Sequence, residues 1–254
     1  MFQYLLTPPD RLPEAEAFRL PPVHLAWHIG PDGNLHGVPG SGACRGGLML
    51  AGTAAAPGDG PADRAVRDIL ALCRDRGFRG VVLDPEEEPS PFLARLIRGL
   101  DRGLERDGRG FFLPERCAAF SRRAFLFLSP AVSGGSLRRR LEQAAEAYGA
   151  RRLVLALERS AEDFPLPSPV GEGRKLTREE LGSLLRRLGG KPQFSPDLCA
   201  CTLPYLDRQS RPRLLLFDNA DSLRRKRDLA RELGIGRFFL LYPQLEDILP
   251  SLLS

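Results

Sequence analysis

The sequence predicts a single (β/α)8 barrel, and three observations lead to this prediction. The chain of 254 residues has the usual length of this fold. Short apolar runs alternate with segments of helical periodicity, and right-handed strand–helix–strand connections close naturally into a parallel barrel. No repeat or linker divides residues 1–254, so we expect one domain, with a long insertion at about 159–213 before the last strand–helix units. The alternative is an open doubly wound sheet, but no glycine-rich phosphate loop follows any expected strand.

The first half of the chain contains four expected strands and two expected helices. The strands are apolar runs that end at turn residues, and they cover 2–6, 23–29, 47–52 and 81–83. One helix is expected over 64–76, where apolar side chains share one face and Gly77 ends the pattern. The next is expected to begin at Ser90 and Pro91, an N-cap followed by a first-turn proline.

The second half continues the alternation around the insertion. Strands are expected at 111–113, 124–128, 153–157, 214–217 and 238–242, and helices at 137–148, 221–233 and 245–253. The insertion opens with residues 160–174, which contain too much proline and glycine for regular structure. Thr177 and Glu180 then fit a capping box that begins one short helix. Such a long insertion usually has a functional role.

Composition argues against several classes of protein. The net charge of +5 is dispersed among arginines that alternate with acids, so we expect no nucleic-acid partner. No apolar run reaches the roughly 18 residues of a membrane span, and no signal peptide is recognisable, so a cytoplasmic location is expected. The five cysteines have no framework spacing, which favours reduced thiols. The oligomeric state is not predicted.

Metal and cofactor chemistry have no clear signal in the sequence. The three histidines are confined to residues 24–36, where core or surface positions explain them better than a shared metal. Lys175, Lys191 and Lys226 lie in expected loops or helices, so no lysine is placed for a Schiff base in an aldolase-type barrel. We therefore expect no metal and no cofactor.

Two acids follow the strand at 81–83 and are the leading candidates for chemistry. Asp84 and Glu86 lie at its carboxyl end, where barrel enzymes place their active sites. Two residues apart on an extended strand, their side chains point the same way with Cα atoms about 6.6 Å apart. The alternative is that the glutamates at 86–88 form a solvated turn before the next helix.

Six further residues are candidates for ligand binding because they lie near expected strand ends or in the insertion. They are Trp27, Glu115, Glu158, Tyr205, Asp218 and Tyr242. All of them except Tyr205 have a structural alternative. The two aromatic residues near strand ends could pack in the core, the two glutamates could form surface ion pairs or helix-start contacts, and Asp218 could cap the next helix.

The order of four segments resembles glycoside hydrolase family 18, the chitinase-like barrels. VHLAWHIGPDGNL is similar to that family's second strand and turn, and FRGVVLDPE lies where its fourth strand carries the motif DxxDxDxE. KPQFSPDLCACTLPYL is similar to its insertion, and FDNADSLRRKRDLARELGIGRFFLLYP to its seventh-to-eighth unit. The resemblance spans most of residues 2–245.

The sequence departs from the family pattern at several positions. Placing the motif on 79–86 keeps Asp84 and Glu86 but puts Arg79 and Val82 at its first two acids. Ser129 or Pro130 stands in place of the strand-six tyrosine. The strand-eight tryptophan falls on Leu241, beside Tyr242. The resemblance therefore implies a degenerate member.

The resemblance also implies a chemistry. In this family the N-acetyl group of the substrate attacks the anomeric carbon, so the protein supplies one acid rather than a pair of carboxylates. Glu86 would protonate the leaving oxygen, which needs a pKa raised toward roughly 6–7, and Asp84 would orient the N-acetyl group. The expected function is binding of an N-acetylhexosamine-type glycan, with retaining hydrolysis left open. The alternative is a non-catalytic structural or protein-interaction barrel.

Overall fold

The computed structural model describes residues 2–53, 62–86, 90–132, 134–168 and 173–253. The chain divides into two compact units, which we describe separately. The first unit comprises Met1–Leu128, Arg152–Ala156 and Arg237–Pro243. The second comprises Ser129–Arg151, Leu157–Gly236 and Gln244–Ser254. The prediction of one domain over residues 1–254 stays a prediction.

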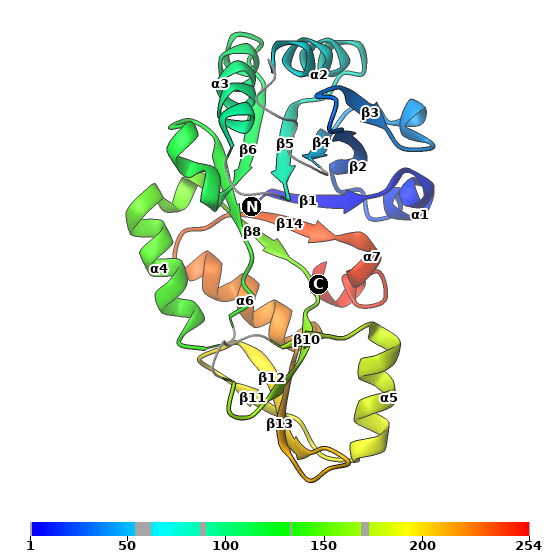
Figure 1. Cartoon of the computed structure of the whole chain (residues 1–254), viewed down its shortest axis with the longest axis vertical. Coiled ribbons are helices and arrows are strands. Elements are labelled where there is room, and N and C mark those ends of the chain that lie inside the picture. The colour runs from blue at the N-terminus through cyan, green and yellow to red at the C-terminus, as the bar shows by residue number, and fades with distance from the viewer. Residues whose placement is uncertain (1, 54–61, 87–89, 133, 169–172, 254) are drawn as a thin grey trace. The chain divides into compact units, whose positions relative to one another are not determined.

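Eight strands form a closed parallel barrel, and they follow one another around the ring in sequence order. The first and last of them, β1 and β14, lie side by side (Figure 1). They are β1 (Phe2–Thr7), β2 (Pro22–Ile29), β4 (Leu48–Thr53), β5 (Gly80–Pro85), β6 (Gly110–Pro114), β7 (Phe125–Leu128), β8 (Leu153–Leu157) and β14 (Arg237–Leu241). β1 pairs with both β14 and β2, which closes the ring. The predicted barrel is therefore confirmed.

The barrel interior is filled by apolar side chains, and along each strand these inward-facing side chains alternate with outward-facing ones. Its buried cluster consists of Val23, Leu48, Val82, Phe112, Val154 and Phe239. Outside the barrel, helices α2 (Asp63–Asp75) and α3 (Pro91–Arg106) pack against each other. A Cβ at Gly103 would lie 2.3 Å from Leu70 Cδ1, so a larger residue there would displace the Leu70 side chain. α2 begins and ends within one residue of its predicted bounds, and α3 begins after the predicted N-cap Ser90.

The outer layer of the first unit is incomplete among the residues that the structure describes. β1 is followed by a short α1 (Leu12–Glu16), and β2 by an antiparallel hairpin with β3 (Leu35–Gly37). β6 is followed by a 3-10 helix, Glu115–Phe120, and not by an α-helix. Sequence periodicity did not predict the hairpin because its second strand is only three residues long.

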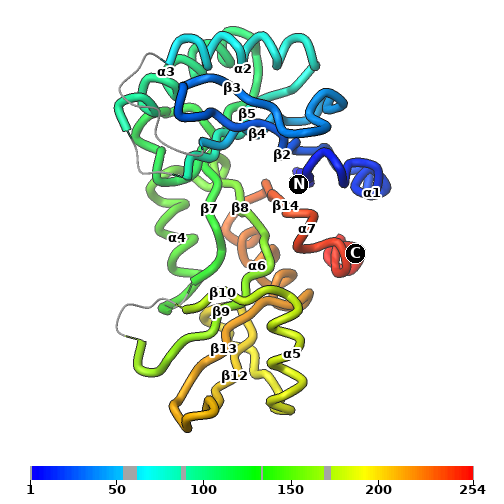
Figure 2. The backbone as a smooth tube through the Cα atoms, turned by 45° about the vertical axis from the view of Figure 1, so that its right-hand side comes forward, coloured from blue at the N-terminus to red at the C-terminus, as the bar shows by residue number. Residues whose placement is uncertain are grey.

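The second unit is built around a five-stranded antiparallel sheet, ordered β10-β9-β13-β12-β11. Its strands are β9 (Ala161–Pro165), β10 (Arg174–Lys175), β11 (Gln193–Ser195), β12 (Ala200–Leu206) and β13 (Pro212–Phe217). Helix α5 (Arg178–Leu188) runs beside this sheet (Figure 2). It buries Leu181 against Leu203, Leu215 and Phe217. The capping box of Thr177 and Glu180 is present, as predicted.

Three sequence predictions for this unit were wrong. The strand predicted at 214–217 belongs to β13, which pairs with β9 and β12 in the antiparallel sheet and not with a barrel strand. Residues 160–174 were expected to be irregular, but they contain β9. A proline is tolerated there because Pro165 lies at the end of the strand. The closing helix predicted at 245–253 is two short ones, α7 (Tyr242–Leu245) and α8 (Leu249–Leu253).

The two longer helices of the second unit, α4 (Leu137–Tyr148) and α6 (Ala220–Glu232), lie close to their predicted positions. Asn219 and Ser222 form a reciprocal capping box at the start of α6. All five cysteines are free and buried. No helix among the described residues is long and apolar enough to cross a membrane.

His24 is a core histidine whose environment opposes protonation. It is 2% exposed in β2, and its Nε2 lies 3.2 Å from the carbonyl oxygens of both Arg45 and Gly46, so Nε2 carries the proton. Its Nδ1 is buried and has no hydrogen-bond partner among the described residues. Burial lowers the pKa of His24, and the hydrogen bond to Gly46 offsets part of this shift.

We expect His24 to make folding stability fall on acidification. Because its folded pKa lies below the unfolded value of about 6.5, the unfolded chain binds more protons. The stability that this group contributes is present above pH 6.5 and is lost as pH falls toward the folded pKa. Urea unfolding of the wild type and His24→Phe at pH 7.5 and 5.5 measures this difference. The same pH dependence in both proteins would contradict the prediction, and His28→Gln, at a half-buried histidine, is the control.

Candidate functional site

The two candidate acids Asp84 and Glu86 lie at the carboxyl end of β5, as the sequence predicted. Val81, Val82 and Leu83 are buried, and the register pairs Asp84 with Gly52 of β4. Because Val82 belongs to the barrel core, strand alternation places Asp84 on the inner face of the barrel, where β5 ends. The Asp84 side chain is 48% exposed, so it is accessible from solvent.

Glu86 follows the strand directly and is exposed. Its backbone N–H donates to the carbonyl of Thr53, 3.4 Å away at the end of the neighbouring β4. The chain therefore stays in register with the barrel for one residue beyond β5. Glu87 and Glu88, the other members of the predicted acidic turn, lie outside the described residues.

Arg116 is a charged neighbour of Asp84 that the sequence did not indicate. It belongs to the 3-10 helix after β6, and its guanidinium lies 4.0 Å from Asp84 Oδ1 and donates to the carbonyl of Pro85. Glu115, the residue that was predicted instead, is half-buried at the start of the same helix. Both members of the Asp84–Arg116 pair are more than a third exposed, so water screens their attraction. The pair orients Asp84 more than it stabilises the fold.

The two aromatic candidates of the first unit are occupied by packing. Trp27 is 7% exposed, and its ring lies 5.3 Å from that of the fully buried Phe78. Tyr242 is 5% exposed, with its ring 5.9 Å from that of Phe18 and 5.6 Å from the guanidinium carbon of Arg11. The geometry thus favours the structural alternative for both side chains.

Glu158 lies in the second unit, directly after β8, and its Oε1 accepts a 2.9 Å hydrogen bond from Ser129 Oγ. Ser129 directly follows β7, where the family resemblance would place a tyrosine. The hydroxyl at this position is therefore paired with the acid that follows the next strand.

Asp218 is fully buried and forms the centre of a polar network in the second unit. Its carboxylate accepts a 2.8 Å hydrogen bond from Lys226 Nζ, with Lys226 itself only 1% exposed. The hydroxyls of Ser160 and Ser222 each donate to the same carboxylate at 2.7 Å. Ser222 is also the reciprocal partner of Asn219 in the cap of α6. Asp218 therefore has a structural role, but not the helix cap weighed for it: Asn219 caps α6, and Asp218 ties Ser222 at the start of that helix to Lys226.

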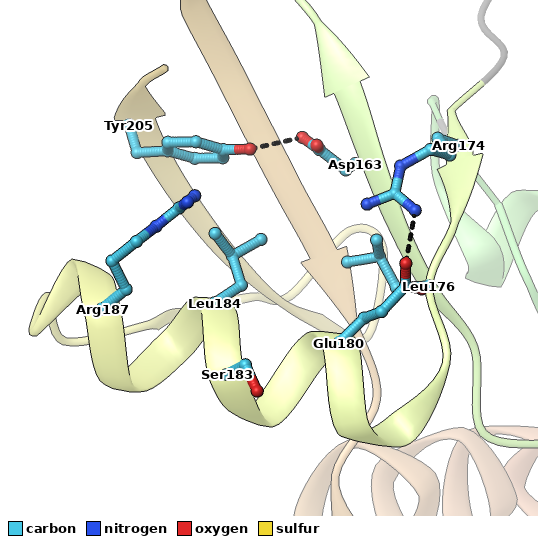
Figure 3. A pocket seen from close by; sticks show the side chains of 8 residues that line it. All are labelled: Asp163, Arg174, Leu176, Glu180, Ser183, Leu184, Arg187 and Tyr205. Carbon is cyan, nitrogen blue, oxygen red and sulfur yellow. Dashed lines mark hydrogen bonds and ion pairs between the residues drawn. The ribbon is translucent and has the colours of Figure 1, made fainter. Parts of the chain in front are cut away.

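Tyr205 forms part of a second network, between the sheet and α5 (Figure 3). Its hydroxyl donates to Oδ1 of the buried Asp163 at 2.9 Å, and Arg213 Nε donates to the same oxygen at 2.9 Å. Burial raises the pKa of Tyr205, and the hydrogen bond to Asp163 raises it further. The hydrogen bond to Asp163 is the main cause that raises the pKa of Arg213.

A cavity of about 300 Å³ lies beside this network. Tyr205 lines it from the sheet, while Ser183 and Arg187 line it from α5 (Figure 3). Arg174 also lines it and forms a 2.8 Å ion pair with Glu180. The Tyr205 ring therefore borders a hollow of the second unit that polar and apolar side chains both line. No group of three or more histidine, cysteine or acidic side chains within the described residues could hold a metal ion.

Comparison with known proteins identifies the fold. No protein-family model matches the sequence, and no curated protein matches it significantly. Three solved structures illustrate the similarity. The spore cortex-lytic enzyme SleL of Bacillus megaterium QM B1551 is 17% identical, with a TM-score of 0.68 over 95% of this chain and 70% of that one. The chitinase of Chromobacterium violaceum ATCC 12472 is 16% identical, with a TM-score of 0.68 over 93% of each chain.

The third structure is the GH18 chitinase of Cycas revoluta in complex with (GlcNAc)3. It is 15% identical, with a TM-score of 0.67 over 99% of this chain and 98% of that one. Such low identities show the fold alone. The family resemblance read from the sequence is confirmed at this level: the chain has a barrel fold like that of the family-18 glycoside hydrolases.

Proposed function

We propose that this chain binds an N-acetylhexosamine-type glycan at the carboxyl end of β5, with Asp84 and Glu86 contacting the sugar. The observation that carries the proposal is the position of these two acids in a barrel of the family-18 type. Asp84 lies on the inner face of the barrel, Glu86 follows it, and both are accessible to solvent. A carboxylate of this kind can accept hydrogen bonds from the amide and hydroxyl groups of a sugar.

We propose that hydrolysis is weak in comparison with binding. Substrate-assisted cleavage requires the N-acetyl group to be held against the anomeric carbon, and each positioning contact contributes to the rate. Asp84, which would orient that group, already faces Arg116. Ser129, at the sequence position of the strand-six tyrosine, donates to Glu158. Both interactions argue for a glycan-binding barrel with reduced catalytic power.

Binding of N,N′,N″-triacetylchitotriose, measured by isothermal titration calorimetry, tests the proposal. We expect Asp84→Asn and Glu86→Gln each to weaken binding by about tenfold or more, because a hydrogen bond to a charged group contributes roughly 1.5–3 kcal/mol. Asp68→Asn on α2 is the matched control, since it removes an exposed carboxylate elsewhere in the first unit. Equal affinities for all four proteins, or no binding by the wild type, would refute the proposed site.

Hydrolysis is measured separately, with a fluorogenic chitobioside between pH 4 and 8. Slow turnover by the wild type that disappears in Glu86→Gln is expected, because we assign protonation of the leaving oxygen to Glu86. Turnover that survives in Glu86→Gln would show that another group supplies the proton. Binding without any turnover by the wild type would identify a lectin-like barrel.

A non-catalytic structural or protein-interaction barrel is the second candidate. The packing of Trp27 and Tyr242 favours it, because neither ring is available to stack on a sugar. This candidate predicts that chitooligosaccharides do not protect the protein against thermal unfolding at millimolar concentration. The glycan-binding proposal predicts a rise in the melting temperature under the same conditions.

A further inference from the structure

The amino ends of the barrel strands enclose a cavity that the glycan proposal does not use. Its volume is about 540 Å³, which lies in the range of small-molecule sites. The first residues of β1, β6 and β14 contribute to its lining, together with residues next to the starts of β2, β4 and β5. We propose that it binds a small organic anion, a carboxylate carried on a flat aromatic body.

The inner wall of the cavity is the apolar core of the barrel. Tyr4, Leu48, Phe112 and Phe125 line it, and all four belong to the core cluster or pack against it. The rings of Phe112 and Phe125 are stacked with centroids 5.0 Å apart, and Tyr4 meets Phe112 edge-on at 5.9 Å. A wall of ring faces and edges favours a flat aromatic ligand.

Two arginines give the cavity lining a positive charge. Arg79 and Arg237 line the cavity, and no aspartate or glutamate is among the described residues that do so. The guanidinium carbon of Arg237 lies 4.2 Å from the ring centroid of Phe125 and 5.3 Å from that of Phe2. Such stacking fixes the plane of a guanidinium and directs its N–H groups outward along its edges. A planar carboxylate is the anion that best matches those donors.

Glycines keep this end of the barrel open. A Cβ at Gly47 would lie 2.2 Å from the carbonyl oxygen of Pro22, and a Cβ at Gly80 would lie 2.4 Å from that of Gly110. The strand starts therefore approach so closely that no side chain fits at these positions. These two positions therefore add no side chain to this end of the barrel.

This cavity is distinct from the proposed glycan site. Arg79 immediately precedes β5 and Asp84 lies near its other end, five residues later. At about 3.3 Å per residue the two positions are roughly 17 Å apart along the strand. Loss of glycan binding would therefore not bear on this second proposal.

Titration with 2-naphthoate, and with its neutral isostere 2-naphthamide, tests the proposal by calorimetry. We expect the wild type to bind naphthoate about tenfold more tightly than naphthamide, because two guanidinium groups favour the charged head. Arg79→Gln should weaken naphthoate binding by about fivefold or more and leave naphthamide unchanged. Added salt should weaken naphthoate alone. Arg98→Gln removes an exposed arginine on α3 away from the cavity and should change neither affinity.

Leu20→Trp provides a test that leaves the charges in place. Leu20 lines the cavity from the connection before β2, so the larger side chain should exclude both ligands while far-ultraviolet circular dichroism stays unchanged. This variant is needed because Arg237→Gln also removes stacking on two rings and can lower stability for that reason alone. The proposal is overturned if naphthoate binds no better than naphthamide, if Arg98→Gln weakens it equally, or if folded Leu20→Trp still binds both.

Discussion

Replacement of Lys226 by methionine is expected to lower the free energy of unfolding by about 3–5 kcal/mol, since it leaves a buried carboxylate without its counter-charge. Lys226 is 1% exposed and Asp218 is 0% exposed, with Nζ 2.8 Å from the carboxylate. The hydroxyls of Ser160 and Ser222 still donate to Asp218 in the variant, but neither carries a charge. The penalty is thus that of burying an uncompensated anion, and urea denaturation measures it.

The double variant Lys226→Met/Asp218→Asn separates this penalty from the loss of packing. The neutral amide can accept a hydrogen bond from one serine through its oxygen and donate one to the other through its nitrogen, so the double variant should be more stable than Lys226→Met alone. Lys191→Met, at an exposed lysine of the same unit, is the control and should change stability by less than about 0.5 kcal/mol. If Lys226→Met lowered the free energy of unfolding as little as the control does, the ion pair would contribute little to stability.

Local patterns predicted most of the barrel because its strands are short, apolar and bounded by turn residues. Val81, Val82 and Leu83 illustrate this, since the run of buried aliphatic residues ends at an acid followed by proline. The same local pattern at 214–217 led us to expect a barrel strand, which was wrong. Nothing in Leu214–Phe217 distinguishes a barrel strand from a strand of the small antiparallel sheet, because its partners β9 and β12 are contributed by other segments.

The candidate site was predictable only where a residue's position along its strand determines which way its side chain points. Asp84 lies near the end of β5 and Glu86 follows the strand, as expected, whereas the contact with Arg116 depends on how the chain turns after β6. Strict alternation would place Trp27 on the same face as Val23. A bulge between Leu25 and Trp27 shifts the register, and Trp27 meets Phe78, as the outward-facing His24 does. Such a bulge has no clear sequence signal here.

Phe112→Ala is expected to lower the free energy of unfolding by about 3–5 kcal/mol, as large-to-small substitutions of buried aromatic residues generally do. Phe112 is 2% exposed, and its ring centroid lies 5.0 Å from that of Phe125, 5.5 Å from that of Phe239 and 5.9 Å from that of Tyr4. Phe112→Leu keeps most of the apolar volume and should cost less. Phe194→Ala, at a phenylalanine 44% exposed, is the surface control.

The variants at Phe112 and Lys226 together test whether the chain unfolds as the single domain predicted from its sequence. Phe112 lies in the first unit and Lys226 in the second, but each unit is assembled from three separate stretches of chain. Because neither unit is continuous, we expect both to unfold in one transition. Trp27, the single tryptophan, reports on the first unit by fluorescence. Lys226→Met should therefore shift the fluorescence and circular dichroism midpoints equally, whereas an unchanged fluorescence midpoint would show that the second unit unfolds independently.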